Sequence, residues 1–564
     1  MSTDKKYDAI VVGSGATGGF AAKELSERGL EVLVLEAGPE LDEALFHKGA
    51  QMKAIGSMSR VRAALAGQHV QARASFFSPD KGFLFVNDWK NPYTCAPDDF
   101  YLWIRGRNVG GRFLSWGRVA LRMSDYDFKA ASRDGIGEDW PIRYDDLVPY
   151  YDQVEKFLGI AGTTEGIRNL PDGKYAATAG LGRVERQLKE TVESRWPERK
   201  VIPWRYVTAD ATPADASKAK RTTSPLAAAA GTGRMELRPN AIAKQISIDP
   251  ATGKATGVAY VDANTRQLRN VSANVVVICA STIESIRLLL NSACVKHPDG
   301  VGNSSGLLGR YFMDQIPCLV FGSVPGSERF GFEIVDGTSP ADNHGGIYIP
   351  RFQNLDRKDY PQFARGFNIQ GMAGRGYVPE GHPAMFGFMG QGEMLPYYEN
   401  RVTVNHKKKD VWGVPVPHIE LSMRENERKM LRCELDTIKE MVQAAGWSVD
   451  FAASLLGLDD PDKVLPNATR FERFMFRRSF RKSMALGAAI HECGGARMGD
   501  DPGKSVLNAY NQCWDAKNIF VTDSSCFVTN GTCGPTLTTM ALTMRACEYI
   551  AKEYGRTSEL SSAA

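Results

Sequence analysis

The chain has 564 residues, of which 43% are hydrophobic and 24% charged, and its formal net charge at pH 7 is +4. A chain of this length can bury a large core, and we expect two or more structural units. The small net charge, with no dense basic run among aromatic residues, argues against a nucleic-acid surface. No apolar stretch reaches the roughly 20 residues that span a bilayer, and no signal peptide or twin-arginine segment is recognisable, so we expect a cytoplasmic protein without a membrane span.

The first pattern along the chain is a glycine-rich turn between an expected strand and an expected helix. Residues 7–12 are apolar and rich in β-branched side chains, and residues 20–25 have helical spacing. Between them, Gly13 permits a tight turn, Gly15 lets the backbone approach a pyrophosphate, and Gly18 lets the helix pack on the strand. The helix N-terminus then points its positive dipole end at the phosphates.

A second expected strand at residues 31–35 ends in Glu36, whose carboxylate can accept hydrogen bonds from ribose hydroxyls. The pattern therefore predicts an adenine dinucleotide, but it does not separate NAD from FAD. Residues 106–118 form a second glycine cluster that could press backbone against a flat ligand. A later strand at 275–278, followed by a small-residue turn and a helix at 279–290, is expected to join the same sheet.

The cysteines predict no metal centre. Ten of them are scattered along the chain without a CxxC pair, and residues 157–277 contain none. Structural zinc sites and iron–sulfur clusters need several ligands brought close together. We expect reduced, mostly buried thiols and no bound metal.

Near the other end of the chain, the glycine-rich segment 491–499 begins with a histidine, His491. An imidazole has an unperturbed pKa near ~6.5, so at neutral pH much of it can accept a proton. The surrounding glycines leave room for a substrate. His491 is therefore our candidate for a general base, against the alternative of a structural histidine.

The order of these motifs resembles that of the glucose-methanol-choline (GMC) family of FAD-dependent oxidoreductases, over nearly the whole chain. Within the family, the sequence motifs are most similar to those of bacterial sugar and glycoside dehydrogenases and oxidases, including pyranose oxidase-like enzymes and glucoside 3-dehydrogenase catalytic subunits. The segments that carry the resemblance are Gly13 to Gly18 with Glu36, Gly110-Gly111, Trp140-Pro141, Gly302 to Gly306, Gly309 to Asp314, Asn400 to Thr403, the His491 segment, Asn518 to Asp523, and Pro535 to Thr538.

The resemblance implies an α/β fold with two discontinuous domains. A Rossmann-like FAD-binding domain is expected from residues 1–156, 241–310 and 481–564. A substrate-binding domain built on an antiparallel sheet is expected from residues 157–240 and 311–480.

The resemblance also implies the reaction, in which an alcohol loses hydride to flavin N5 while His491 removes the hydroxyl proton. The family normally places Asn or His before the proline of its closing motif, where it hydrogen-bonds the substrate oxygen. Here Gly534 stands at that position. We take Asn530 as the substitute catalytic residue, with a turn-forming asparagine and a bound water as the open alternatives.

The cofactor is expected to be noncovalent FAD, because Ser115 stands where similar covalent-flavin sugar oxidases have a histidine. Asp523 is expected to contact the cofactor, with a helix cap as the alternative. The full set of expected cofactor-binding residues is Gly13, Gly15, Ala16, Thr17, Gly18, Glu36, Arg107, Gly110, Gly111, Ser115, Trp116, Ala280, Asp523, Thr536 and Leu537.

The expected substrate is a sugar or glycoside, oxidised at a ring secondary alcohol, with C3 favoured. Aromatic and polar residues mix in the expected substrate domain, which suits a sugar, although such residues are more often plain core. Residues 208–233, rich in Ala, Ser and Thr, are expected to form a mobile loop or lid.

The electron acceptor stays open between oxygen, quinone and cytochrome. A small accessory subunit is a further expected partner, and one bearing an export signal would place the chain in the periplasm. Two other activities are carried as alternatives. The stronger is an oxidoreductase for steroids or alkyl alcohols, and the weaker is a GMC-type lyase with redox-silent FAD.

Overall fold

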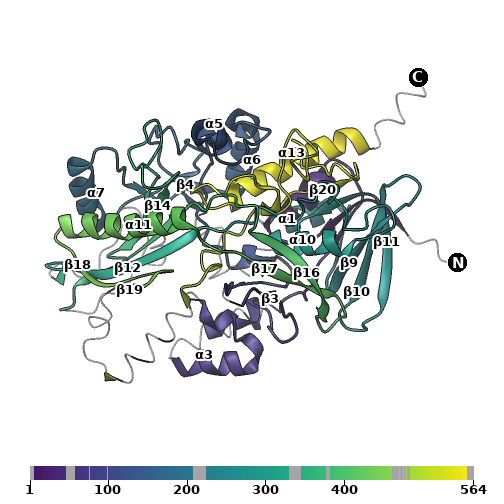
Figure 1. Cartoon of the computed structure of the whole chain (residues 1–564), viewed down its shortest axis with the longest axis horizontal. Coiled ribbons are helices and arrows are strands. Elements are labelled where there is room, and N and C mark those ends of the chain that lie inside the picture. The colour runs from purple at the N-terminus through teal and green to yellow at the C-terminus, as the bar shows by residue number, and fades with distance from the viewer. Residues whose placement is uncertain are drawn as a thin grey trace.

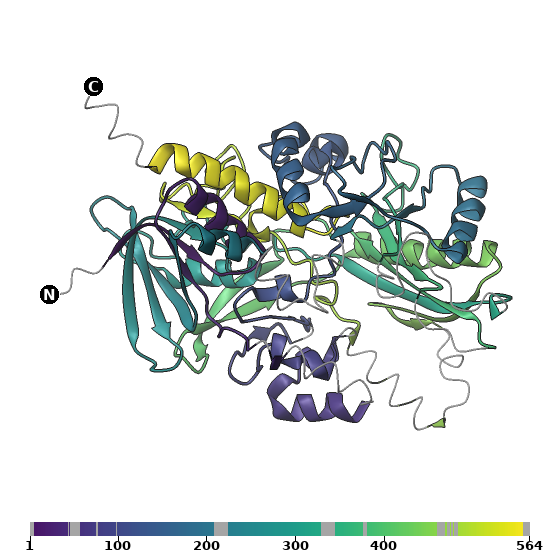
Figure 2. The same ribbon diagram turned by 180° about the vertical axis from the view of Figure 1, so that it is seen from behind.

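The structure is a computed structural model that describes residues 5–42, 44–45, 57–74, 77–97, 99–207, 224–328, 345–375, 381–459, 469–470, 474, 478 and 483–555. Figures 1 and 2 show two bodies side by side, one built on the sheet that contains β9 to β11 and the other on the sheet that contains β12 and β18. The α-helices are α1 (Ala16–Glu27), α3 (Ser57–Ala63), α4 (Asp125–Phe128), α5 (Ala130–Asp134), α6 (Val148–Leu158), α7 (Arg183–Arg195), α9 (Pro225–Gly231), α10 (Thr282–Asn291), α11 (Glu425–Ala444) and α13 (Thr536–Tyr554).

The first body holds a seven-stranded sheet in the order β8-β2-β1-β11-β10-β9, with β20 pairing β11. The strands of this sheet are β1 (Lys6–Val12), β2 (Val32–Leu35), β8 (Met235–Arg238), β9 (Ala241–Ile248), β10 (Ala255–Asp262), β11 (Leu268–Ile278) and β20 (Ile519–Val521). β8, β2, β1, β11 and β20 pair in parallel, whereas β10 and β9 are antiparallel additions at the edge.

The parallel strands are continuous apolar runs in sequence because helices cover both faces of the sheet. The side chains of β2 are buried along its whole length, as are those of residues 275–278 in β11, as expected of strands with both faces covered. The long C-terminal helix α13 packs against α1 and α6 (Figure 1). The expected Rossmann-like sheet, with its late strand from residues 275–278, is confirmed.

The second body holds a sheet in the order β19-β18-β12-β15-β14-β13-β6, in which all pairings are antiparallel. Its strands are β6 (Ile202–Pro203), β12 (Ile316–Val324), β13 (Ile347–Ile349), β14 (Phe367–Ala373), β15 (Ala384–Gly392), β18 (Ser448–Ser454) and β19 (Gly457–Asp459). The amphipathic helix α11 covers one face, where Met430, Glu434 and Ile438 are buried. The expected antiparallel sheet is confirmed.

Two small sheets complete the chain, β16-β17-β3 and β5-β4-β7. Their strands are β3 (Thr94–Cys95), β4 (Ile160–Gly162), β5 (Ala177–Thr178), β7 (Tyr206–Val207), β16 (Arg401–Lys409) and β17 (Pro415–Glu420). β16 and β17 pack on α10, which belongs to the first body. This differs from our expectation, which placed the whole of residues 311–480 in the substrate domain.

The expected boundary at residue 240 is also corrected. β8 pairs in parallel with β2, and α9 packs on α1, so residues 225–238 belong to the nucleotide-binding sheet and not to the substrate domain. This region overlaps the loop or lid that we expected at residues 208–233. Residues 208–223 lie outside the described residues, but 225–231 form helix α9, because a run of alanines follows Pro225 at the first turn and the Ser224 hydroxyl accepts from the Ala227 amide.

Candidate active site

The turn between β1 and α1 has the geometry that its glycines predict. Gly13 has φ 98°, and a Cβ there would lie 2.4 Å from the Cys279 carbonyl oxygen. A Cβ on Gly18 would lie 1.9 Å from the Gly13 carbonyl oxygen, so the helix packs on the turn too closely for a side chain. At Gly15, by contrast, a Cβ would meet no atom within 4 Å. Gly15 is therefore the glycine that leaves space open for a ligand.

Glu36 lies at the end of β2, where the turn needs an acceptor. Its carboxylate accepts hydrogen bonds from the Ser14 amide at 3.0 Å, the Ser14 hydroxyl at 2.6 Å and the Gly38 amide at 2.8 Å. Burial raises the pKa of this carboxyl, whereas the Ser14 and Gly38 hydrogen bonds oppose the shift. Glu36 thus fixes the turn and also lines the adjoining cavity.

A cavity of about 910 Å³ extends from this turn to the antiparallel sheet. It brings together residues that are more than 500 positions apart in sequence. The predicted site residues that line it are Gly13, Gly15, Ala16, Thr17, Glu36, Arg107, Gly111, Ser115, Trp116, Ala280, His491, Asp523 and Thr536. Four predicted site residues, Gly18, Gly110, Leu537 and Asn530, are not among the described residues that line it.

The wall of the cavity suits a flat, polyanionic dinucleotide. The N-termini of α1 and α13 both face the cavity through Ala16, Thr17 and Thr536, and helix N-termini favour negative charge. Gly111 packs against Gly15, because a Cβ built on Gly111 would lie only 3.2 Å from the Gly15 Cα. These close backbone approaches leave a slot that side chains do not fill, so the residues present fit FAD.

Arg112 adds a positive charge to the same wall. Its Nη2 pairs with the Glu492 carboxylate at 2.6 Å and donates to the Ser281 hydroxyl at 2.7 Å. Its buried Nη1 has no hydrogen-bond partner among the described residues. An unsatisfied, buried guanidinium N–H is costly unless a ligand accepts from it.

Asp523 caps a turn and also lines the cavity, so cofactor contact stays a prediction for it. Its carboxylate accepts from the Ser525 amide at 3.0 Å and so caps the 3₁₀ turn Ser524–Cys526, and it also accepts from the Ser285 hydroxyl. At the same time it lines the cavity. Burial raises the pKa of its carboxyl, and the Ser285 and Ser525 hydrogen bonds oppose that shift.

His491 lines the cavity and is held by the two residues that precede β12. Its backbone amide donates to the Asp314 carboxylate at 2.9 Å, and its Nδ1 lies 2.6 Å from Gln315 Oε1. Gln315 is fully buried, and its Nε2 donates to the carbonyl oxygens of Gly531 at 2.9 Å and Cys533 at 3.3 Å. Because the amide nitrogen is committed to two carbonyls, the oxygen must face His491, and Nδ1 must carry the proton.

The other imidazole nitrogen, Nε2, lies next to Gly534. A Cβ built on Gly534 would lie 3.5 Å from Nε2, so the glycine leaves space beside it. Burial, with a smaller contribution from the charge of Arg112, lowers the pKa of His491 to about 4. The imidazole is therefore neutral at pH 7, with its free lone pair on Nε2.

Asp314 helps to hold the backbone of His491 and Gln315 in place. Its carboxylate accepts hydrogen bonds from the backbone amides of His491 and Gln315 at 2.9 and 2.8 Å, and from the Tyr101 hydroxyl at 3.2 Å. Burial and the nearby charge of Glu492 raise the pKa of Asp314 to about 8. Asp314 is the last residue of the Gly309 to Asp314 motif noted in the sequence. Gln315, the next residue, was missed in the sequence because only its contact with His491 distinguishes it.

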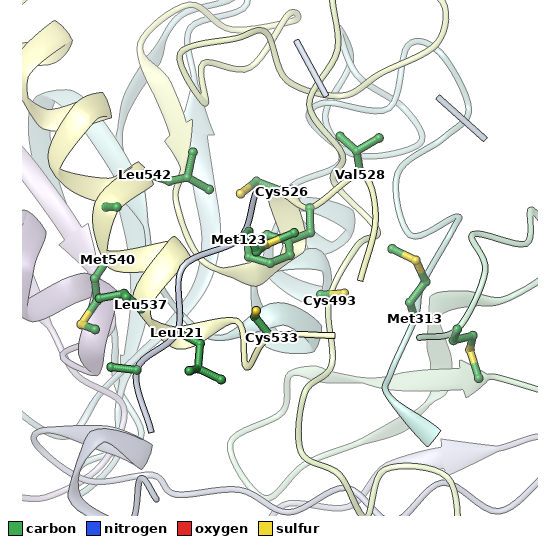
Figure 3. Close-up of a cluster of buried hydrophobic side chains, with 14 of the residues drawn as sticks. Leu121, Met123, Met313, Cys493, Cys526, Val528, Cys533, Leu537, Met540 and Leu542 are labelled. Carbon is green, nitrogen blue, oxygen red and sulfur yellow. The ribbon is translucent and has the colours of Figure 1, made fainter. Parts of the chain in front are cut away.

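Asn530 lies behind His491 and not beside its Nε2. Its side-chain amide donates to the His491 carbonyl oxygen at 3.3 Å and to Cys493 Sγ at 2.8 Å, and the residue is 2% exposed. Figure 3 shows an apolar cluster that includes Cys493, Cys533, Met123 and Met313. The position of Asn530 favours a role in holding the histidine loop.

The antiparallel sheet contributes the remaining wall of the cavity. Gln370, Met389 and Gln391 line it from β14 and β15, and Gln370 Nε2 donates to Gln391 Oε1 at 2.9 Å. Arg118, whose φ of 66° is unusual for a non-glycine residue, lines it from the glycine-rich loop. These polar groups lie on the same cavity as His491 and can bind a hydroxylated substrate.

Comparisons with known proteins identify the family. Residues 7–315 and 396–543 match the two family models described as GMC oxidoreductase, so the chain belongs to this family. A 2-methyl-1,2-propanediol dehydrogenase of Mycolicibacterium austroafricanum is 28% identical and covers 97% of this chain and 95% of its own. A C-glycoside 3-oxidase of Microbacterium trichothecenolyticum is 23% identical and covers 99% and 98%. The solved pyridoxine 4-oxidase of Mesorbium loti has the same fold, with a TM-score of 0.58 and 18% identity over 96% of this chain and 98% of its own.

Membership confirms the expected class of enzyme, an FAD-dependent oxidoreductase that acts on CH–OH groups. Within the described residues, no cluster of His, Cys, Asp or Glu has the geometry to hold a metal ion. The ten cysteines are all free. No helix of the described part is long and apolar enough to cross a membrane.

Proposed function

We propose that this enzyme oxidises a ring secondary alcohol of a sugar or glycoside to a ketone, with C3 as the favoured position and His491 as the general base. The observation that carries the proposal is the orientation of His491. Its Nδ1 is occupied by Gln315, His491 lines the cavity, and its unprotonated Nε2 adjoins the space that Gly534 leaves without a side chain. A base of this kind can accept the hydroxyl proton of an alcohol that lies within hydrogen-bond reach.

FAD, when bound, supplies the acceptor for the hydride that leaves the alcohol carbon. The residues expected to hold it are those of the β1–α1 turn, Glu36, the Gly111 loop and the N-terminus of α13. Noncovalent attachment is part of the proposal, since Ser115 offers no imidazole for a flavin bond.

The roles of the protein residues follow from their positions. The two glutamine amides, Gln370 and Gln391, bind hydroxyl groups of the substrate on the side of the antiparallel sheet, because an amide can both donate and accept. His491 takes the proton of the reacting hydroxyl at Nε2, and the positive charge that develops on its ring is stabilised through Nδ1–H and Gln315. No side chain at position 534 helps to hold the reacting oxygen, so that task falls to His491 itself or to a water, whereas Asn530 holds the histidine loop.

The substrate class rests on the amides in the cavity wall and on the activity named for the C-glycoside 3-oxidase relative. The strongest alternative is a small alkyl alcohol, favoured by the 2-methyl-1,2-propanediol dehydrogenase relative and by the apolar Met389 in the same wall. The proposal leaves the electron acceptor open. It can be oxygen, a quinone, a cytochrome or an accessory subunit.

The test is anaerobic reduction of the purified holoenzyme, monitored through the bleaching of the oxidised flavin band. Methyl glucoside, glucose and 2-methyl-1,2-propanediol are added separately, and the sugar product is analysed by NMR for a carbonyl at C3. We expect methyl glucoside to reduce the flavin fastest and to give the 3-keto product. Faster reduction by the diol would replace the proposed substrate with the alkyl alcohol, and readmission of air shows whether oxygen reoxidises the flavin.

The base is tested with His491→Ala. We expect the variant to keep its flavin and to be reduced at least ~100-fold more slowly, since general-base catalysis contributes that much or more. His406, exposed on β16 and absent from the cavity wall, gives the matched control His406→Ala. A wild-type rate in the His491 variant would exclude it as the base.

A further inference from the structure

The antiparallel sheet presents one face to α11 and the other to the active-site cavity. Cys318 and Gly390 lie against α11, where a Cβ on Gly390 would meet the Glu434 side chain. Successive side chains of a strand alternate between the two faces. The opposite face therefore consists of the odd-numbered residues of β12 and β15 and the even-numbered residues of β14.

The strand register arranges this second face in rows that run across β12, β15 and β14. The first row is Pro317, Gln391 and Asn368, and the second is Leu319, Met389 and Gln370. The third row is Phe321, Gly387 and Met372, and Met385 follows beyond it on β15.

The character of the rows changes along the face. The first two rows carry the glutamine amides that line the cavity near His491. The third row and Met385 are apolar, yet Phe321 is 39%, Met372 is 42% and Met385 is 56% exposed. A group of exposed large apolar side chains on one face commonly marks a binding surface. We call these three residues the apolar strip.

The apolar strip is shaped as a platform. A Cβ on Gly387 would lie 2.7 Å from the ring of Phe321, so the ring lies over the glycine between the neighbouring strands. The Phe321 ring is stacked on that of Phe451 in β18, with centroids 6.2 Å apart and an interplanar angle of 24°. Phe451 belongs to a small buried cluster with Ala453 and Met484, so the ring is supported from one side.

We propose that the apolar strip binds an aryl aglycone of a glycoside whose sugar ring occupies the cavity at Gln370 and Gln391. This inference rests on the proposed function, because it extends the same substrate site. Consecutive rows are about 6.8 Å apart, two residues of an extended strand. An aromatic group attached to the sugar can span that distance, whereas a methyl group cannot.

The side chains of the strip suit an aromatic occupant. A phenyl ring can stack on or pack edge-on to Phe321, and methionine sulfur makes favourable contacts with aromatic rings while adapting to their shape. The polar first rows and the apolar third row thus match a substrate with a hydroxylated head and an aromatic tail. A second copy of this chain is the other occupant that such a surface could take.

The test compares phenyl and methyl glucosides, in both anomers, as reductants of the holoenzyme. We expect the wild type to show a kcat/KM roughly tenfold or more higher for the phenyl glucoside, through a lower KM, because the ring buries apolar surface. Phe321→Ala and Met385→Ser should each lower that phenyl-to-methyl ratio. Leu268→Ser, at an exposed apolar residue of β11 that is 57% exposed, is the control and should leave the ratio unchanged.

Three results would overturn the proposal. Equal kcat/KM for the two glucosides in the wild type would exclude an aglycone site, although the proposed function would stand. Failure of both glucosides to reduce the flavin would remove the proposed function and this inference together. A dimer in sedimentation velocity that Met385→Ser converts to a monomer would assign the strip to a second copy of the chain. Met385→Ser is the informative variant if Phe321→Ala does not fold, since Met385 is the most exposed of the three.

Discussion

Gln315 Oε1 lies 2.6 Å from His491 Nδ1, and the two residues are 176 positions apart in sequence. The side-chain amide nitrogen of the same glutamine donates to the carbonyl oxygens of Gly531 and Cys533, in the loop that precedes Gly534. One buried amide thereby ties the histidine to the closing loop. It also settles which imidazole nitrogen is free to accept a proton.

The first prediction concerns this contact. Gln315→Glu keeps an acceptor at Nδ1 but places a negative charge beside the ring, so the kinetic pKa of His491 should rise by roughly 1–3 units. Gln315→Met removes the acceptor and should slow flavin reduction roughly tenfold or more, since the ring loses its fixed tautomer. The measurement is the pH profile of anaerobic flavin reduction, with Gln245→Glu on β9 as the control. An unshifted profile in the glutamate variant would show that Gln315 has only a packing role.

The second prediction is the pH dependence of the wild type. The native pKa of His491 lies at about 4, so the proposed base stays unprotonated across the neutral range. Flavin reduction should be nearly constant between pH 7 and about 5 and should fall as pH approaches 4. A midpoint near ~6.5, the ordinary histidine value, would mean that the ring is solvated.

The same shift has a consequence for stability. Below the unfolded-state pKa of ~6.5 the unfolded chain binds a proton that the native His491 does not bind until about pH 4. The contribution of His491 to stability is therefore lost progressively as pH falls through this window. Chemical denaturation of His491→Ala and wild type at pH 7 and pH 5 measures it, and the wild type should lose more stability than the variant.

The third prediction separates two glycines of the β1–α1 turn. Gly18→Ala forces a Cβ against the Gly13 carbonyl and should destabilise the fold by at least about 1 kcal/mol. Gly15→Ala meets no protein atom, so the apoprotein should unfold normally while FAD binds more weakly. Thermal unfolding of the apoproteins and fluorescence titration with FAD give the two readouts. Equal FAD affinity in Gly15→Ala and wild type would place the cofactor away from this turn.

The fourth prediction concerns Asn530. Its amide donates to the His491 carbonyl and Cys493 Sγ and is buried, so Asn530→Ala should lower the free energy of unfolding by about 1–3 kcal/mol. Because the side chain does not line the cavity, the KM for the sugar should change little. A raised KM at unchanged stability would instead return Asn530 to the role of a substrate contact.

Much of the nucleotide-binding half followed from the sequence alone. The role of Gly18 and the positive φ of Gly13 are local, because a tight turn and a helix packed on its own preceding strand depend on residues a few positions apart, although the Cys279 carbonyl that crowds Gly13 comes from a distant segment. The late strand at residues 275–278 could be predicted because a buried parallel strand is a continuous apolar run. The family motifs then gave the histidine segment and the antiparallel sheet.

The tertiary structure decided what depends on contacts between distant segments. Asn530 is near His491 in sequence but donates behind it, whereas Gln315, far away in sequence, fixes its ring. β8 joined the nucleotide sheet through pairing with β2, which a local pattern does not encode. Backbone conformation is set largely by neighbours along the chain, but the partner of a buried polar group, and the cavity it faces, are set only when the whole core has packed.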